Sequence, residues 1–288
     1  MIRSMTAFAR RGRRADWGEI VWEIRAVNHR YLEMGFRLPE DLRSLESACR
    51  KAISSRLRRG KIDSTLKVNF SDSAASDIQV NQRLLDSVIA RSAEVARQLD
   101  APSPLNPLSL LRWPGVVAEA ERDLGPVEQA AVELLDEALT ALSESRANEG
   151  ARIREMLLER CDAVAAHVKT IRGHLPDVRA RIREKLTTRL AELTADFDRD
   201  RVEQELVILA QKMDVDEELD RLDSHITETR KVLDRNDAVG RRLDFLMQEF
   251  NREANTLASK SNDPETTRLA VDIKVLVEQM REQVQNIE

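Results

Sequence analysis

Residues 217–260 constrain the fold of this chain more than any other stretch. Their sequence, EELDRLDSHITETRKVLDRNDAVGRRLDFLMQEFNREANTLASK, reads as two amphipathic helices joined by a polar turn near Asn236 and Asp237. Apolar residues recur every three or four positions in both halves, which is typical of helices with one buried face. The first apolar stripe consists of Leu219, Leu222, Ile226 and Leu233, and the second of Leu243, Leu246, Met247, Phe250, Ala254 and Leu257.

Charged residues follow the edge of each stripe. At about 100° per residue, one line on the first helix holds Glu218, Arg221, His225 and Glu228, and one line on the second holds Arg242, Glu249, Glu253 and Lys260. Neighbours on such a line are one turn apart and can interact. If the two helices pack as an antiparallel pair, we expect these polar edges to converge in a groove beside the seam.

The residue types on these edges favour divalent-metal and phosphate chemistry. Carboxylates are ligands for Mg²⁺ or Mn²⁺, and imidazole also suits Mn²⁺. We expect Glu249 and Glu253 to hold such an ion, with Glu218 or Glu228 as further ligands, while His225 transfers protons. Phosphates would be bound by Arg221, Arg252 and Lys260. The alternative is an ordinary lattice of ion pairs on helix surfaces, which the same spacing also supports.

The first 70 residues predict a small α+β unit with the order β-β-α-β. Residues 2–9 favour a strand that closes at Gly12, residues 17–28 alternate around Trp22, and residues 31–38 favour a further extended piece. A helix is expected over residues 40–58 and a strand over residues 62–70. A long, mostly helical region follows, so the predicted fold class is α+β.

Basic residues gather in two clusters within this unit. Residues 1–67 contain 16 Lys+Arg and 8 Asp+Glu, whereas the whole chain has a net charge of -5. The residues that we expect to bind phosphates are Arg10, Arg11, Arg13, Arg14, Arg56, Arg58, Arg59 and Lys61. Some of them also complement the dipole of the expected helix. An intermolecular contact between oppositely charged parts, or an uneven solvated surface, would explain the asymmetry as well.

The remaining residues predict helices and a division into three parts. Asn81 is expected to cap a helix that reaches about residue 99, and a proline-rich connector follows at residues 100–107. A helical run from Pro126 should break at residues 173–176, and a polar helix should follow over residues 177–200. We expect domains at residues 1–125 and 201–288, joined by a helical connecting or oligomerisation region at residues 126–200.

The sequence also favours a cytoplasmic protein without a membrane segment. Cys49 and Cys161 are isolated, which fits a reducing compartment. The N-terminus lacks the apolar run of a signal peptide, and no stretch approaches the roughly 20 apolar residues of a membrane span.

Several long motifs resemble the YicC family of bacterial endoribonucleases. They are MIRSMTAFAR, WEIRAVNHRYLE, RLPE, RGKID, LRWPG, VEQELVILAQKMDVDEELDRLDSHI, VGRRLDFLMQEFNREANTLASKS and VEQMREQVQNIE, and together they cover essentially the whole chain. The resemblance implies a metal-dependent endoribonuclease that cuts single-stranded or structured small RNA, a ring-like homohexamer, and no nucleotide cofactor. Within these motifs lie Glu218, Arg221, His225, Glu249, Arg252, Glu253, Asn255 and Lys260.

The leading hypothesis is therefore RNA hydrolysis with a Mn²⁺ or Mg²⁺ cofactor, in the turnover of small RNA. Partners would be RNA, further copies of the chain in a hexamer, and other RNA-decay nucleases. The competing hypothesis is a non-catalytic RNA-binding or adaptor protein that forms a homo-oligomeric ring. A third is metal-independent cleavage in which a ribose 2′-hydroxyl is the nucleophile and His225 moves protons.

Overall fold

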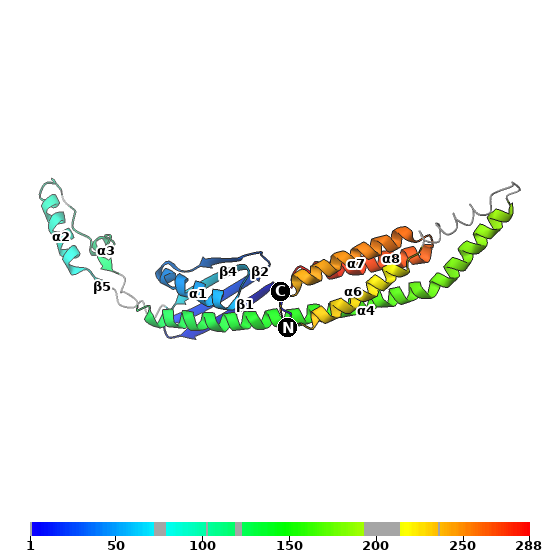
Figure 1. Ribbon diagram of the computed structural model, residues 1–288. Helices are drawn as coiled ribbons and strands as arrows, with labels where there is room; N and C mark the ends of the chain where they lie inside the picture. Colours follow the sequence, from blue (N-terminus) through cyan, green and yellow to red (C-terminus); the bar gives the residue numbers. More distant parts are fainter. Residues whose placement is uncertain (1, 72–78, 102, 119–122, 193–213, 236) are drawn as a thin grey trace. The chain divides into compact units, whose positions relative to one another are not determined.

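The computed structural model describes the chain except for residues 1, 72–78, 102, 119–122, 193–213 and 236 (Figure 1). It divides into two compact units. The helical unit comprises Met1–Ala7, Ala26–Asn28 and Leu142–Glu288, and the sheet unit comprises Phe8–Arg25 and His29–Ala141. The three-part division expected from sequence stays a prediction, because its boundary at residues 200–201 lies outside the described residues.

The sheet has four strands in the order β1-β2-β4-β3. These are β1 (Ala7–Ala15), β2 (Gly18–Val27), β3 (Leu32–Arg37) and β4 (Gly60–Phe70). β3 pairs with β4 in parallel, and the connection between them is η1 (Glu40–Leu45) followed by α1 (Glu46–Arg56). The α+β class is confirmed, and the extended piece expected at residues 31–38 is the edge strand β3.

The core of the sheet unit follows the predicted alternation. Ile20, Trp22 and Ile24 of β2 are fully buried, since successive side chains of a strand point to opposite faces. The Trp22 indole donates a hydrogen bond of 2.8 Å to the carbonyl of Ala131, so its polar atom is satisfied inside the core. The expected end of the first strand at Gly12 is wrong, because β1 runs through Gly12 while it pairs with β2.

Residues 79–118 form a separate substructure within the sheet unit. Its elements are β5 (Gln79–Val80), α2 (Gln82–Ala96), α3 (Pro107–Leu111) and β6 (Val117–Ala118), with β5 and β6 antiparallel. The predicted cap is confirmed, as the Asn81 side chain accepts a hydrogen bond from Leu84 N at 3.1 Å. Neither helix contains a buried residue. Apolar side chains that stay exposed here include Val95, Leu99, Leu105, Leu108 and Trp113.

Helix α4 (Gly125–Glu192) continues where the sequence predicts a break. Pro176 lies inside it, although proline removes one helical hydrogen bond and clashes with the preceding turn. Two buried side chains, Ile171 just before the expected break and Leu175 within it, belong to the core of the helical unit. Tertiary packing therefore outweighs the local cost of proline and Gly173.

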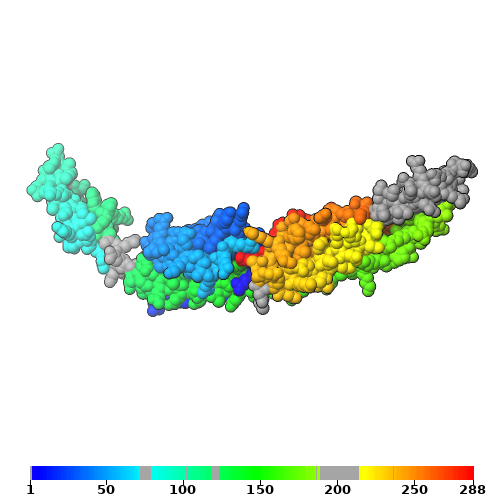
Figure 2. Space-filling view, in the orientation of Figure 1, coloured from blue at the N-terminus to red at the C-terminus, as the bar shows by residue number. Residues whose placement is uncertain are grey.

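The helical unit packs α4 with α6 (Asp216–Leu233), α7 (Gly240–Lys260) and α8 (Pro264–Val284). Both predicted apolar stripes are confirmed as core: every stripe residue of α6 and α7 is at most 5% exposed. The yellow surface of α6 and the orange surface of α7 adjoin along their length in Figure 2. Asp263 caps α8, accepting hydrogen bonds of 3.0 Å from both Thr266 N and Thr266 Oγ1.

Ion pairs connect α4 to the side of α6 that faces it. Arg172 contacts Asp220 at 2.6 Å and Asp223 at 3.0 Å, and Arg179 contacts Asp216 at 2.8 Å. Arg154, which comes earlier in α4, pairs with Asp234, which directly follows α6. These contacts show that α4 and α6 are antiparallel, so the opposite edge of α6 is left to meet α7.

Residues near the two chain ends pair with each other inside the helical unit. Met5 N donates to Asn286 O at 2.8 Å, and Glu288 N donates to Arg3 O at 2.9 Å. The Arg146 side chain, which is 5% exposed, donates to Ser4 O at 2.7 Å and to the Glu288 carboxylate at 2.5 Å. Gly150 admits this arrangement, since a Cβ there would lie 2.2 Å from Ile2 O.

Candidate metal centre on the α6–α7 seam

The two polar edges predicted from sequence meet along one side of the α6–α7 seam. Contacts join the helices at both ends of the expected lines and between them, so the antiparallel pairing and the convergence of the edges are confirmed. From one end to the other, the facing partners are Lys260 and Glu218, Glu253 and Arg221, the carboxylates of Glu249 and Glu253 around His225, and Arg242 and Glu228.

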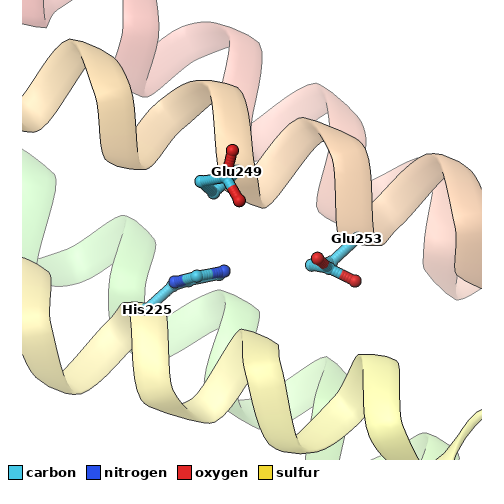
Figure 3. Close-up of side chains that lie close together, drawn as sticks. All are labelled: His225, Glu249 and Glu253. Carbon is cyan, nitrogen blue, oxygen red and sulfur yellow. The ribbon is translucent and has the colours of Figure 1, made fainter.

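Three of these side chains form a cluster with the donor atoms of a metal site. One ligand atom each from His225, Glu249 and Glu253 lies within 4.8 Å of the other two. Figure 3 shows the imidazole of His225 and the carboxylate of Glu253 in the space between α6 and α7, with Glu249 in front of the α7 ribbon. The i, i+4 spacing of Glu249 and Glu253 stacks them one turn apart on the same face. Buried stripe residues fix both helices below them.

Glu253 is a buried carboxylate whose charge is partly offset by one arginine. Its side chain is 3% exposed, and Arg221 donates to its Oε1 at 3.3 Å. Arg221 also binds Glu217 Oε1 at 2.5 Å, and the hydrogen bond with Glu253 is the main reason that the pKa of Arg221 rises above its ordinary value. Glu217, one turn before Arg221, is a contact that the edge analysis did not single out, although its i, i+4 spacing with Arg221 is readable in the sequence.

The surroundings of His225 favour the neutral form of its imidazole. Burial lowers its pKa, and Arg221 acts in the same direction, while Glu253 and Glu249 oppose the shift. Its ring packs edge-to-face against Phe250 with 5.6 Å between centroids. Within the described part of the chain, its Nε2 is buried and has no hydrogen-bond partner. A neutral ring with an unsatisfied buried nitrogen is the form that ligates a metal.

The other predicted ligands lie outside this cluster. Glu218 is 5% exposed and accepts a hydrogen bond of 2.8 Å from Lys260 Nζ. Glu228 is paired with Arg242. Their ligand roles stay predictions, and the geometry favours a centre built from His225, Glu249 and Glu253.

The predicted RNA-binding residues near the seam differ in availability. Arg252 is the most exposed, with 68% of its side chain accessible and a 3.9 Å ion pair to Glu249. Arg221 and Lys260 are engaged with Glu253 and Glu218. Arg252 is therefore the cation best placed to meet a phosphate next to the cluster.

The basic residues of the sheet unit also differ in whether an acidic side chain already pairs with them. Arg13 is bound to Glu133 at 2.6 Å and Glu137 at 2.7 Å. Three others pair more simply: Arg56 with Asp136, Arg10 with Glu23 at 3.7 Å, and Arg14 with Glu19 at 4.0 Å. Arg11, Arg58 and Lys61 are exposed, and no ion pair to another described residue is recorded for them.

Comparison with known proteins places the chain in a class of RNA-cleaving enzymes. The model of the family described as Endoribonuclease YicC-like, N-terminal region, matches residues 2–155, and that described as Endoribonuclease YicC-like, C-terminal, matches residues 171–288. The chain belongs to this YicC-like endoribonuclease family, so the resemblance of its motifs is confirmed.

Two curated relatives match along their full lengths. The "Probable endoribonuclease YicC" of Haemophilus influenzae is 44% identical over 288 residues, and that of Clostridioides difficile is 32% identical over 293 residues. Each alignment covers 100% of both chains. Among the described residues, no helix combines the length and the apolar character needed to cross a membrane.

Proposed function

We propose that this protein is a divalent-metal-dependent endoribonuclease whose centre is formed by His225, Glu249 and Glu253. The observation that carries this proposal is their convergence within 4.8 Å, together with the buried Nε2 of His225, which has no hydrogen-bond partner among the described residues. The names of the family and of both relatives support RNA as the substrate. The donor set, two carboxylates and one imidazole, suits Mn²⁺ and also Mg²⁺.

The chain's own residues would hold the ion and the RNA. Glu249 and Glu253 supply two carboxylates on one face of α7, and His225 supplies an imidazole nitrogen from α6. A bound divalent ion would lower the pKa of a water molecule and offset the charge that develops on a phosphate. Arg252 would orient the RNA backbone at the edge of the cluster, since arginine forms bidentate contacts with phosphate. The buried nitrogen of His225 favours a ligand role over the proton-transfer role expected from sequence.

A cleavage assay with a matched control variant tests the proposal. Wild type should cut a short labelled single-stranded RNA with Mn²⁺ and should stop when a chelator is added. Glu253→Gln removes one ligand charge and should lower the rate by about a hundredfold or more, since even indirect partners of metal ligands contribute about 10–100-fold. Glu282→Gln neutralises an exposed carboxylate of α8 and should leave the rate unchanged.

Other outcomes identify the competing mechanisms. Chelator-resistant cleavage that requires a 2′-hydroxyl at the cut position would assign the nucleophile to the ribose. RNA binding without turnover would favour an adaptor, in which the ion pairs of the seam are structural. Calorimetric titration of Mn²⁺ into wild type and Glu253→Gln measures the metal site independently of cleavage, and equal affinities would overturn it.

We further propose that the protein acts as a homohexamer in small-RNA turnover. The exposed apolar residues of α2 and its flanking segments, among them Val95, Leu99 and Trp113, support coverage by another copy, because large exposed apolar patches mark interaction sites. Association with other RNA-decay nucleases stays a prediction. A solution mass six times that of one chain is expected by light scattering, and a monomer mass would contradict the assembly.

A further inference from the structure

Tyr31, which lies outside the seam, is the only tyrosine of the chain and is 63% exposed. It precedes β3, and hydrogen bonds fix its backbone on both sides. Gly60 N donates to Tyr31 O at 3.1 Å, and Tyr31 N donates to His29 Nδ1 at 3.3 Å. Because β3 is an edge strand, a large ring is presented at the border of the sheet from a constrained backbone.

One cation packs against this ring, and a basic turn lies beside its backbone. The guanidinium carbon of Arg30 lies 5.3 Å from the ring centroid, within the range of a cation–π interaction. The parallel register pairs Leu32 with Gly60 and Glu33 with Lys61, so the turn between α1 and β4 lies beside Tyr31. That turn carries Arg58 and Arg59, and Lys61 follows it.

The local charge indicates an anionic ligand. Arg58 and Lys61 are exposed, and among the described residues neither has a recorded ion pair. Two acidic side chains lie in the paired register: Glu33, which is 3.6 Å from His29 Nε2, and Asp63, which lies opposite Gly35. A solitary exposed aromatic residue is ordinary on a protein surface. An exposed ring with a stacked guanidinium beside a basic turn instead matches the way single-stranded nucleic acids are bound, through base stacking and phosphate contacts.

We propose that Tyr31 is a stacking platform for an unpaired RNA base, with Arg58 and Lys61 binding the flanking phosphates. This proposal rests on RNA being the substrate class of the proposed function. It adds a binding site that recognises unpaired bases, separate in its residues from the His225–Glu249–Glu253 cluster. Stacking is tolerant of sequence because every base offers a π face, so the site selects single-stranded over fully paired RNA.

Binding measured by fluorescence anisotropy in the Glu253→Gln background tests the stacking site without cleavage. The probes are a short labelled oligouridylate and an abasic oligoribonucleotide of equal length, which keeps the phosphates but has no bases. Tyr31→Ala should weaken oligouridylate binding by about 5- to 150-fold, the range for loss of one stacked base, and leave abasic binding unchanged. Tyr31→Phe should retain the affinity.

Two further variants exclude trivial causes. Val275→Ala shortens a comparably exposed apolar side chain of α8, 51% accessible, and should leave both affinities unchanged. Tyr31→Leu keeps apolar bulk without a π face, so it should behave as Tyr31→Ala while keeping the wild-type melting temperature.

The outcomes separate this proposal from the one on which it rests. Failure of the parent protein to bind oligouridylate would overturn RNA as the substrate class. If the parent binds but Tyr31→Ala and Tyr31→Leu bind oligouridylate equally well, the stacking site is overturned. Equal loss of affinity for both probes would likewise overturn it, since the effect would then not depend on a base.

Discussion

Two buried carboxylates, Glu253 and Asp263, differ in how well hydrogen bonds and ion pairs stabilise their charge. Asp263 receives hydrogen bonds from Thr266 N and Thr266 Oγ1 and an ion pair from Arg181. Glu253 is more deeply buried and has one 3.3 Å contact to Arg221. Burying a charge is costly unless it is well paired. Glu253, the carboxylate with fewer partners, is thus the one that lies next to His225 and Glu249, where a bound cation would offset its charge.

Asp263 provides a prediction about acid stability. Its pKa is lowered from the ordinary 3.8, mainly by the hydrogen bond from Thr266 N. Its contribution to stability is therefore present above about pH 3.8 and is lost as pH falls through the lowered pKa. Asp263→Ala removes the cap and should reduce the free energy of unfolding at pH 7 by about 0.5–2 kcal/mol. Urea unfolding measured between pH 7 and pH 3 should show this difference shrinking in acid.

Asp263→Asn is the matched control, because asparagine also caps helices but does not titrate. Its stability relative to Asp263→Ala should be nearly independent of pH. A wild-type advantage that stays constant down to pH 3 would show that the carboxylate charge contributes nothing to the cap.

The sequence alone predicts which face of a helix a residue lies on better than it predicts which side chain that residue contacts. The 100° spacing correctly places His225, Glu249 and Glu253 on facing edges, and Asp263 with Pro264 is a recognisable helix start. Which cation is engaged depends on side chains distant in the chain. Arg13 and Lys61 look alike as members of basic clusters, yet the contacts of Arg13 come from Glu133 and Glu137, a hundred or more residues away.

At the scale of elements, the unbroken α4 shows packing prevailing over local propensity. A proline inside a helix costs about 3 kcal/mol or more, and burying one large apolar side chain gains about 1.5–3 kcal/mol. Ile171 and Leu175, both buried beside Pro176, are together sufficient to offset that cost. Sequence rules for breaks weigh only the local term, so they predicted two helices where there is one.

The same comparison predicts what holds α6 in place. Leu222→Ala empties a fully buried position of its stripe and should lower the free energy of unfolding by about 2–5 kcal/mol. Arg172→Gln removes the contacts to Asp220 and Asp223, which are largely exposed, and should cost about 1 kcal/mol or less. Denaturant unfolding of both variants measures the two effects. A larger loss for Arg172→Gln would mean that the ion pairs, and not the core, position α6.

At the scale of the whole molecule, the charge asymmetry read from the sequence is reduced by internal pairing. Residues 1–67 have 16 Lys+Arg, yet Arg13, Arg56, Arg10 and Arg14 are each paired with an acid of the sheet unit. A cation that is already neutralised releases few counterions when RNA binds. Composition therefore overstates the number of phosphates that this part of the chain can neutralise.

The salt dependence of RNA binding should reveal this difference. Lys61→Gln removes an exposed cation and should reduce the slope of log affinity against log salt by about 0.7 for a single strand. Arg13→Gln removes a cation bound to Glu133 and Glu137 and should leave the slope nearly unchanged. Affinities measured with the Glu253→Gln protein between low and moderate salt provide both slopes. Equal changes for the two variants would show that the internal ion pairs open when RNA binds.

The pairing of residues 3–5 with residues 286–288 has a consequence for the synthesis of the protein. A ribosome makes the first of these segments roughly 280 residues before the second, at about 5–20 residues per second. The early segment must therefore wait roughly 15–60 s for its partner. The sheet unit, in contrast, draws all its residues from the first half of the chain. The sheet unit can therefore finish folding before residues 286–288 of the helical unit have been made.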